Sequence, residues 1–559
     1  MRVFKRLKYV MVGVVATLGV LFLGAAAKSN TFDLGKNIEL LVGMFRGVEL
    51  FYVDDVEPDK LMNAAAEGMS SILDPYTEFL AGDKMEQFTT LTTGRYGGIG
   101  SLIRASGDYV KFAEPYEGSP ADRAGIRPGD RIVAIDGRDA KGYTTDTVSL
   151  LLKGEPGSII RLTVEKFPSE KREELKLRRE TINLPGVPYY GFVADSIGYI
   201  KHDDFTEDCS RDMRKAYESL RSQGIKGVIL DYRGNGGGIL QEAVKILSMF
   251  VPKGTEVVST RAKDARNNIV FATENEPIDL STPIVVLTDS GTASAAEIVS
   301  GALQDLDRAV LVGQRTFGKG LVQTPYPLGY NSYVKITTAK YYLPSGRCIQ
   351  AIDYAHRNED GSVGYVPDSL VREFSTRAGR KVFDGGGVVP DRKTEPRYIG
   401  SFAVALYAAG LVDDFVEDYC RRHYETLRVV PTEYVFDDKA YAEFETFMTD
   451  KTVPWQSEAA AAWRRFKTAA QRERRTEDIE QNIKAIEENL DSDTRENLAF
   501  YSDEIGDIIE QEIVLRYNYN SGAIRHHIAS DKEVAEAVSI LNQQPLYDQI
   551  TAADKVPEK

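Results

Sequence analysis

The feature that most constrains the fold is an alternation of short apolar runs and amphipathic runs between Ile197 and Gly313. The apolar runs GVILDYR (Gly227–Arg233) and PIVVLT (Pro283–Thr288) are typical of buried strands. This alternation favours an α/β domain. The predicted strands are Ile197–Phe205, Gly227–Arg233, Pro283–Thr288, Arg308–Gly313 and Tyr333–Tyr342, and the predicted helices are Glu207–Gln223, Ile239–Phe250 and a helix that begins at Ser294.

The chain has 559 residues, too many for one hydrophobic core. Residues 32–92 have helical spacing, residues 94–166 read as short strands with glycine turns, and the chain after residue 399 is again helical, with long amphipathic runs at Asp478–Asn489 and Tyr501–Arg516. We therefore expect five parts. They are a leader at 1–30, a helical arm at 31–92, a strand-rich domain at 93–168, the α/β domain at 169–397 and an all-helical extension at 398–559.

The leader reads as an export signal. Four basic residues precede an apolar run, Tyr9–Ala27, which ends in small residues suited to cleavage. The run is also about long enough to span a bilayer if it stays uncut. Because the basic residues come first, we expect the rest of the chain outside the cytoplasm, in a bacterial periplasm, either free or anchored to the inner membrane by this segment alone.

Composition excludes several classes of protein. A net charge of -15 argues against a nucleic-acid partner, because phosphate binding needs a basic surface. Three distant cysteines without a CxxC pattern exclude a disulfide scaffold and give no zinc motif. The pair His526–His527 has no ligand cluster around it, so we expect no metal. His202, on a strand edge, is the nearest histidine that could act as a general base.

Ser294 lies at the junction between a predicted strand and the following helix, in a run of small residues. A serine there is next to unpaired helix N–H groups and the positive end of the helix dipole. An oxyanion formed at this point would be stabilised, with the Ala295 amide as one donor. The alternative is an N-cap serine, because Glu297 completes the pattern of a capping box. The serine alone leaves both interpretations open.

Lys319 lies 25 residues further on, between Gly318 and Gly320. The segment Gly313–Lys319 matches the first seven positions of a nucleotide-binding P-loop, but Gly320 stands where that motif needs Ser or Thr to hold magnesium. A solvated glycine turn is a second alternative. The third is a buried neutral lysine whose pKa falls from about 10.4 toward 7 or 8. Such a lysine can serve a serine as general base, with Gln323 orienting its amine.

Three segments of the strand-rich region resemble a PDZ domain in the circularly permuted form of bacterial proteases. They are YGGIGSLIR (Tyr96–Arg104), SPADRAGIRPGDRIVAIDG (Ser119–Gly137) and LLLKGEPGSIIRLTV (Leu150–Val164). PDZ domains bind C-terminal peptides as an added strand, and loop N–H groups receive the terminal carboxylate. The resemblance places these amides at Gly98, Ile99, Gly100 and Ser101. The alternative is that the glycines only form a tight turn.

Five further segments resemble the C-terminal processing peptidases, also called tail-specific proteases, and occur in that family's order. They are LDYRGNGGGIL, GTASAAEIVSGALQD, VGQRTFGKGLVQ, YYLPSGRCIQ and GGGVVPD. The resemblance implies a crotonase-like protease domain with an inserted PDZ domain. It also implies Ser294 as nucleophile, Lys319 as general base, Gln323 as the residue that orients the lysine, and oxyanion donors at Ala295 and Gly237. Thr292, Gly236 and Ala296 depart from the family's usual residues.

These observations predict an exported serine endopeptidase that recognises protein C-termini and needs no cofactor. The expected partners are protein substrates with exposed apolar C-termini, an adaptor protein, and further copies of the chain through the helical segments. One competing class is a non-catalytic scaffold with a vestigial protease fold. The other is a nucleotide-binding enzyme, which Gly320 and the expected compartment disfavour.

Overall fold

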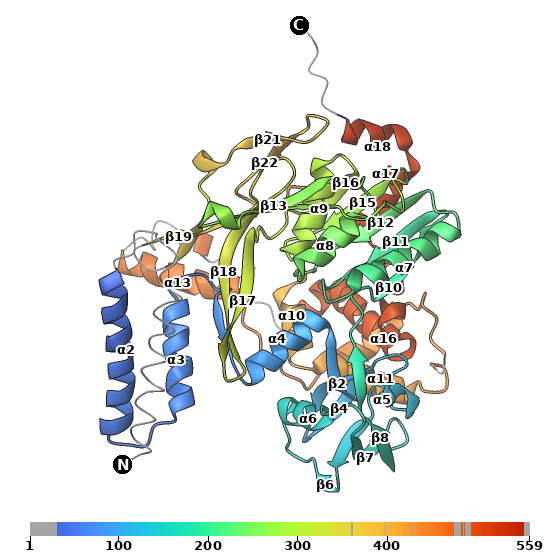
Figure 1. Ribbon diagram of the computed structural model, residues 1–559. Coiled ribbons are helices and arrows are strands. Elements are labelled where there is room, and N and C mark those ends of the chain that lie inside the picture. Colours follow the sequence, from blue (N-terminus) through green and yellow to red (C-terminus); the bar gives the residue numbers. More distant parts are fainter. Residues whose placement is uncertain are drawn as a thin grey trace. The chain divides into compact units, whose positions relative to one another are not determined.

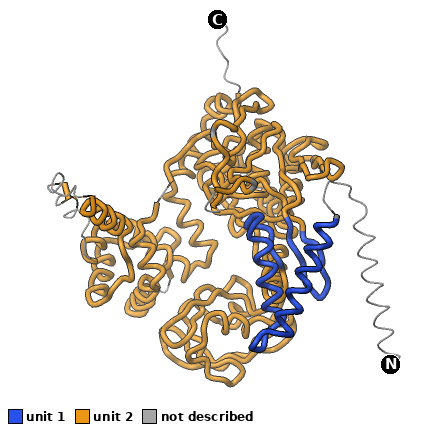
Figure 2. The backbone as a smooth tube through the Cα atoms, turned by 90° about the vertical axis from the view of Figure 1, so that its left-hand side faces the viewer, with its two compact units in different colours: residues 1–79, 325–336 blue, residues 80–324, 337–559 orange. Residues whose placement is uncertain are grey.

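The computed structural model describes residues 31–358, 362–396, 398–427, 429–473, 482–483, 486 and 494–552. The predicted leader and nearly all of the predicted run Asp478–Asn489 lie outside these residues. The chain forms two compact units, which Figure 2 shows in two colours. One unit takes in residues 1–79 and 325–336, and the other takes in residues 80–324 and 337–559.

The first unit contains two helices of the predicted arm, α2 (Thr31–Phe51) and α3 (Pro58–Ser70), and the start of a short strand, β1 (Glu78–Leu80). Most apolar side chains of α2 are exposed, including Phe32 and Met44. An ion pair joins Glu78 to Lys335 within this unit. Among the described residues of the chain, no helix combines the length and the apolar character that a membrane crossing requires.

The strand-rich domain has the sheet order β3-β4-β5-β7-β8, with β6 beside β5 (Figure 1). One helix of this domain, α6 (Thr145–Leu152), places Val148 and Leu152 in the domain's core. The sheet extends beyond residue 168, because β8 pairs with β7. β9 pairs with β2 in a separate two-stranded sheet. The elements are α4 (Asp83–Thr93), β2 (Arg95–Gly98), β3 (Ser101–Ser106), β4 (Tyr109–Pro115), α5 (Pro120–Arg123), β5 (Arg131–Ile135), β6 (Arg138–Asp139), α6, β7 (Ile159–Lys166), β8 (Lys171–Arg178) and β9 (Glu180–Asn183).

The α/β domain is built on a six-stranded sheet with the order β10-β11-β12-β15-β16-β23. β10 is antiparallel to β11, and the remaining neighbours are parallel. The sequence pattern does not predict β10, because a strand at the edge of the sheet needs no continuous apolar run. The elements are β10 (Tyr189–Ala194), β11 (Ile197–Lys201), α7 (Cys209–Ser222), β12 (Gly227–Asp231), α8 (Leu240–Leu247), β15 (Ile284–Thr288), α9 (Ala295–Asp305), β16 (Ala309–Gly313) and β23 (Arg392–Lys393).

Side chains alternate across this sheet, as strand geometry requires. Val228 and Leu230 of β12 pack in a core with α7, α8 and α9. Ile229, between them in sequence, packs in a second core with residues of two C-terminal helices, α17 (Lys532–Asn542) and α18 (Gln544–Thr551). The sequence predicts these helices as part of a separate extension, 398–559. Within that extension, α17 and α18 cover the second face of the α/β sheet.

The rest of the α/β region forms short sheets around these layers. Strand β18 pairs with β13 and with β17, and β13 also pairs with β14. The elements are β13 (Glu256–Ala262), η1 (Ala265–Asn267), β14 (Ile269–Ala272), β17 (Leu321–Gly329), β18 (Ser332–Tyr342), β19 (Ile352–Arg357), β20 (Val363–Tyr365), η2 (Asp368–Leu370), β21 (Glu373–Ser375) and β22 (Lys381–Phe383).

The C-terminal helices α10, α11, α12, α15 and α16 share an aromatic core around Phe402, Phe415 and Phe444, to which the described residues of α13 do not contribute. A buried ion cluster joins them to the strand-rich domain. In it, Lys111 of β4 lies 2.8 Å from both Asp413 and Glu417. The helices are α10 (Ser401–Ala408), α11 (Leu411–Arg422), α12 (Asp438–Phe447), α13 (Glu458–Arg472), α15 (Thr494–Phe500) and α16 (Ser502–Ala529).

Candidate active site

The candidate site lies at the carboxyl ends of three neighbouring parallel strands, β12, β15 and β16. The loop after β12 contains Gly237, the turn after β15 contains Ser294, and the loop after β16 contains Lys319. The carboxyl edge of an open α/β sheet is the usual place for a ligand, because the loops there converge. The fold therefore brings together three segments that the sequence presents separately.

Ser294 is the residue immediately before α9, as the sequence predicts. Its backbone has φ 56° and ψ −117°, in a region that L-residues rarely adopt. Strain of this kind is found where a sharp strand-to-helix turn presents a nucleophilic serine. The turn has no GxSxG sequence, so its geometry is visible only in the structure.

Glu297 joins the serine turn, residues 289–294, to the lysine loop, residues 314–320. Its side chain is fully buried, and one carboxylate oxygen, Oε2, accepts both the Ser294 N–H at 2.8 Å and the Lys319 N–H at 2.9 Å. The other oxygen accepts the Thr316 hydroxyl at 2.5 Å and the Gly318 N–H at 2.8 Å. Burial raises the pKa of Glu297 to about 7, although these four hydrogen bonds favour the ionised form.

The backbone half of the predicted capping box is therefore present, since Glu297 accepts the Ser294 N–H. The same carboxylate also receives three donors from residues 316–319, which a simple helix cap does not explain. The capping and catalytic interpretations of this turn are therefore compatible. Glu297 holds the helix start and the lysine loop together.

Tyr341 makes a second connection between the same two segments. Its hydroxyl lies 2.5 Å from the carbonyl oxygen of Lys319 and 3.1 Å from the carbonyl oxygen of Ser294. Its side chain is buried. The backbones of Ser294 and Lys319 are thus joined on the N–H side by a carboxylate and on the carbonyl side by a phenol.

The glycines around Lys319 are required by close packing. Gly318 has φ +85°, and a Cβ there would lie 2.4 Å from the Cβ of Ala351. A Cβ on Gly320 would lie 2.8 Å from the backbone nitrogen of Gln350. Both glycines are buried, whereas Lys319 between them is half-buried rather than fully buried as the catalytic interpretation expects. Gln323, the predicted orienting residue, lies on β17 and donates its amide to the Thr337 hydroxyl at 3.2 Å.

Gly237 lies against the serine. A Cβ on Gly237 would meet the Ser294 Cβ at 2.7 Å and the Ala295 backbone nitrogen at 2.8 Å, and its φ is +91°. Only glycine fits so close an approach. The Gly237 N–H, however, donates to the side-chain oxygen of Asn235 at 2.8 Å, so in this conformation it does not point into an open oxyanion site. Within the described residues, the Ala295 amide donates to no protein acceptor.

Further hydrogen bonds hold the loop that contains Gly237 to the serine turn. The Gly234 N–H donates to the Asp289 carboxylate at 2.9 Å, and the Ala293 N–H donates to the Asn235 carbonyl at 2.9 Å. Through these bonds, any shift of the loop is transmitted to the residue next to Ser294.

A cavity of about 770 Å³ opens beside the lysine loop. Its walls are largely apolar, and they include Phe317, two residues from Lys319, and Ser290 from the serine turn. Other lining residues are Ile352, Val366, Val371, Phe383 and Val389. The cavity offers an apolar side chain a place next to the candidate site.

The predicted carboxylate-binding loop of the strand-rich domain joins β2 to β3. Gly98 ends β2, Ile99 is buried in the domain's core, and Gly100 has φ +76°. Ser101 begins β3, and its hydroxyl donates to the Glu114 carbonyl at 3.0 Å. The role of this loop in binding a peptide C-terminus stays a prediction.

Neither His202 nor His526 contributes to the site. The side chain of His202 is fully buried beside Phe205 and Tyr232, and burial lowers its pKa to about 3. A neutral ring enclosed in this way cannot exchange protons with a substrate. His526 is bound by Glu510 at 2.7 Å and by the Thr432 carbonyl at 2.7 Å.

Sequence reasoning missed three features of the site. Glu297 was visible only as a capping residue, and Tyr341 only as part of the segment YYLPSGRCIQ. Nothing in the sequence connected Asp531 and Glu533 of the C-terminal helices with this edge of the sheet, yet both contact Arg233, the residue before the glycine loop. Contacts over about 300 residues of sequence leave no local pattern.

Three family models match this chain. Peptidase family S41 matches residues 196–356, a PDZ domain matches 111–166, and the C-terminal helical domain of probable PDZ-proteases matches 402–541. A carboxy-terminal-processing protease of Bartonella bacilliformis is 35% identical over 350 residues, which are 62% of this chain and 77% of that protein. A probable CtpA-like serine protease of Staphylococcus aureus is 33% identical over 316 residues, 56% of this chain and 62% of that protein. The solved structure of a photosystem II D1 C-terminal processing protease is 29% identical with a TM-score of 0.35, covering 65% of this chain and 94% of that one.

The match to peptidase family S41 and the likeness to a carboxy-terminal-processing protease define the class of this protein as a serine-type peptidase. The chain belongs to the S41 family of carboxy-terminal-processing, CtpA-like proteases, as its sequence motifs predict. It combines an S41 protease domain with a PDZ domain and a C-terminal helical domain.

Proposed function

We propose that this protein is an exported endopeptidase that cleaves by acyl transfer with Ser294 as nucleophile and Lys319 as general base. The observation that carries the proposal is the shared hydrogen bonding of the two backbones: a single Glu297 oxygen accepts both N–H groups. Two residues held by one oxygen atom are neighbours in space. The strained turn at Ser294 and the buried glycines beside Lys319 support the same assignment.

In the proposed reaction, the neutral Lys319 amine takes the proton of the Ser294 hydroxyl while the serine oxygen bonds to the scissile carbonyl carbon. The C–N bond then breaks, and the lysine ammonium protonates the leaving amine. Water attacks the resulting ester, the lysine takes its proton, and the C–O bond to the serine breaks. Lysine returns that proton to Ser294, so the enzyme is regenerated without metal or nucleotide.

The Ala295 amide is the first oxyanion donor in this proposal, because it lies at the helix N-terminus beside Ser294. Gly237 is the second donor. Because its N–H now bonds Asn235, we propose that substrate binding turns this peptide group toward the oxyanion. Gln323 is proposed to orient the lysine amine, which requires its side chain to leave Thr337 or to use its free carbonyl oxygen.

The PDZ domain is proposed to bind substrate C-termini through Gly98, Ile99, Gly100 and Ser101. Protein substrates with exposed apolar tails fit a PDZ domain and the apolar cavity beside the lysine loop. Assembly with further copies through the helical segments and use of an adaptor belong to the same proposal. So do the crotonase-like class of the protease domain, the periplasmic location and an anchor at the N-terminal segment, which rest on the sequence.

The test is cleavage of a folded reporter that carries an apolar, unstructured C-terminal tail. The parent protein should degrade the reporter, and a reporter with a charged tail should be degraded more slowly. Ser294→Ala and Lys319→Ala should each abolish cleavage while keeping the parent's thermal unfolding temperature. Full cleavage by either variant would refute the proposed dyad.

A further inference from the structure

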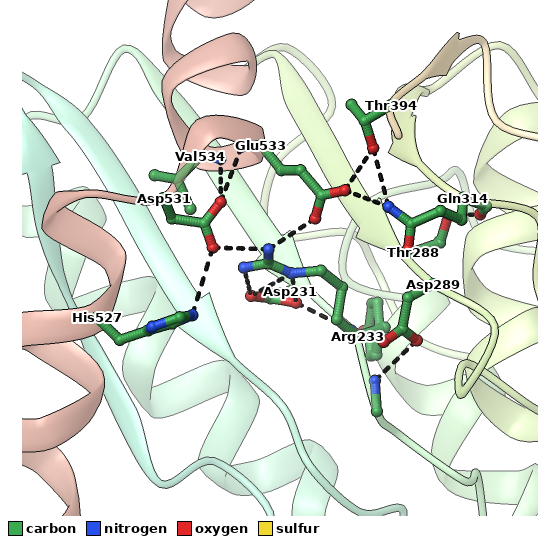
Figure 3. Close-up of polar contacts among 12 residues, drawn as sticks. Asp231, Arg233, Thr288, Asp289, Gln314, Thr394, His527, Asp531, Glu533 and Val534 are labelled. Atoms are coloured by element: carbon green, nitrogen blue, oxygen red, sulfur yellow. Dashed lines mark hydrogen bonds and ion pairs between the residues drawn. The ribbon is translucent and has the colours of Figure 1, made fainter. Parts of the chain in front are cut away.

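A charged cluster connects the C-terminal helical domain to the first residue of the oxyanion loop, defined here as residues 233–238. Figure 3 shows the guanidinium of Arg233 between Asp231 on one side and two carboxylates of the C-terminal domain on the other. Its Nη1 atom donates to Asp531 at 2.7 Å and to Glu533 at 2.7 Å. Its Nε and Nη2 atoms donate to Asp231 at 3.0 and 2.6 Å. All three nitrogen atoms of this guanidinium therefore donate to carboxylates.

Glu533 also reaches the loop that contains Lys319. Its second oxygen accepts the side-chain amide of Gln314 at 2.5 Å and the hydroxyl of Thr394 (Figure 3). Gln314 is the first residue after β16, and its carbonyl accepts the Thr288 hydroxyl at 2.9 Å. Thr288 is the last residue of β15, the strand that leads to Ser294. One carboxylate thus contacts the starts of two catalytic loops.

The cluster is sheltered from water, which strengthens its electrostatic attraction. Side-chain exposure is 17% for Arg233, 7% for Asp531 and 12% for Glu533. Burial opposes ionisation of Asp231, but Arg233 and Lys201 outweigh it and lower the pKa of Asp231 to about 2. The contact between Arg233 and Asp231 is therefore between full charges.

The helix that supplies the two carboxylates cannot move freely. Asp531 caps α17 by accepting the N–H groups of Glu533 at 2.8 Å and Val534 at 3.2 Å. Val534, Ala537 and Ile540 of the same helix pack in the second core of the sheet. The apolar face of α17 anchors the helix, and its acidic N-terminus then holds Arg233 in a fixed place.

We propose that Asp531 and Glu533 are positioning residues for the peptidase reaction. They act through Arg233 and Gln314 to hold the oxyanion loop and the lysine loop in register with Ser294. This inference rests on the proposed function of Ser294 and Lys319, and it gives the C-terminal helical domain a part in the reaction. Neither carboxylate contacts the substrate.

Glu533 is the better residue to change, because Asp531 also caps the helix. Glu533→Gln keeps the size of the side chain but removes the charge. Its N–H₂ group would also face a donor, either Arg233 or the pair Gln314 and Thr394. Displacement of a catalytic group by about 1 Å can cost 100-fold in rate. We expect Glu533→Gln to lower kcat about tenfold and to change KM by less than about twofold, since the loops but not the tail-binding domain are disturbed.

The matched control is Glu536→Gln on the same helix. Glu536 is 43% exposed and lies 3.9 Å from Arg392, away from the oxyanion loop. It should keep the parent's kcat. Arg233→Lys should resemble Glu533→Gln, because lysine keeps the charge but loses the fork that contacts three carboxylates. The double variant should lose less kcat than the product of the two single losses, because both changes remove the contact between Arg233 and Glu533.

The experiment measures kcat and KM on the tailed reporter together with hydrogen–deuterium exchange of peptides covering residues 232–240. The result expected is a lower kcat and faster exchange in Glu533→Gln and Arg233→Lys, with neither effect in Glu536→Gln. Parental kcat and parental exchange in Glu533→Gln and Arg233→Lys, or rate effects that multiply in the double variant, would overturn the inference. If the parent and Ser294→Ala cleave equally, the proposed function fails instead, and the exchange of residues 232–240 still decides the positioning role.

Discussion

Two glutamates organise the same edge of the sheet from its opposite faces, and they do so by different means. Glu297, in α9, is fully buried, and backbone N–H groups and a hydroxyl bind it. Glu533, in α17, is partly buried and binds a guanidinium, an amide and a hydroxyl. Glu297 joins two backbone segments directly, whereas Glu533 acts through the side chains of other residues. The contacts of Glu297 should therefore matter more for the reaction.

The two residues also differ in what they cost the folded protein. Glu297 brings a carboxyl group into the core, where N–H groups and a hydroxyl bind it, and burial raises its pKa. Glu533 meets the positive charge of Arg233 at 2.7 Å. A buried carboxylate such as Glu297 lowers the stability of the fold, and such a loss is typical of residues that fix the geometry of an active site.

The largest effect should come from the residue that Glu297 positions. Lys319→Arg keeps a long cation, but arginine stays protonated and cannot act as a base. We expect a loss of kcat/KM of about 10⁴-fold or more, as large as that of Lys319→Ala. Steady-state cleavage of the tailed reporter measures it. Retention of more than a tenth of the parent's activity would show that Lys319 acts only as a charge.

The next largest effect should follow Glu297→Gln. The glutamine N–H₂ group would face backbone donors, so at least one hydrogen bond is lost and the unfolding free energy falls by about 1–3 kcal/mol. We expect kcat to fall about 100-fold, because the serine turn and the lysine loop separate.

A matched control for Glu297→Gln exists at the other end of α9. Asp305→Asn also changes a buried carboxylate, one that pairs with Arg347 at 2.7 Å. It should lower the unfolding temperature but leave kcat unchanged at a temperature where the protein is folded. Equal losses of kcat in the two variants would mean that Glu297 matters only for stability.

The raised pKa of Glu297 predicts a dependence of stability on pH. The folded protein holds this proton more tightly than the unfolded chain, so the contribution is full below about pH 4.5 and is lost as pH rises through about 7. The parent's stability relative to Glu297→Gln should therefore shrink by up to about 3 kcal/mol between pH 5 and pH 8. Urea unfolding of both proteins at the two pH values measures this. A difference that grows with pH would contradict the assignment.

The smallest effect should come from the outermost contact of Glu533. Thr394→Val removes the hydroxyl that donates to Glu533 but leaves the contacts with Arg233 and Gln314. The change also removes the hydrogen bond that the Gln314 side-chain amide donates to this hydroxyl at 2.9 Å. We expect kcat to fall less than about threefold, because the contacts of Glu533 with Arg233 and Gln314 remain and each lost hydrogen bond contributes about 1 kcal/mol. A larger fall than in Glu533→Gln would mean that the end of β23, rather than Arg233, is what the helix positions.

The same comparison shows how far the sequence can be read. The α/β alternation, the order of the motifs and the position of Ser294 before α9 could be predicted, because each depends on local pattern. Glu297 was within reach, three residues from the serine, but its partners at residues 316–319 were not. Glu533 carries no local signal, because its contacts with Arg233 and Gln314 arise only when α17 packs on the sheet. The Gly237 hydrogen bond to Asn235 likewise depends on a turn that sequence does not specify.

The account depends most on the claim that Ser294 and Lys319 form one site, and labelling with a serine-directed phosphonate tests it most directly. Mass spectrometry of the intact protein and of its peptides should find one adduct in the parent, located on Ser294. Ser294→Ala and Lys319→Arg should both remain unlabelled, while Glu536→Gln is labelled at the parent's rate. Labelling of Ser294 at the parent's rate in Lys319→Arg, or an adduct on another residue in Ser294→Ala, would contradict the account.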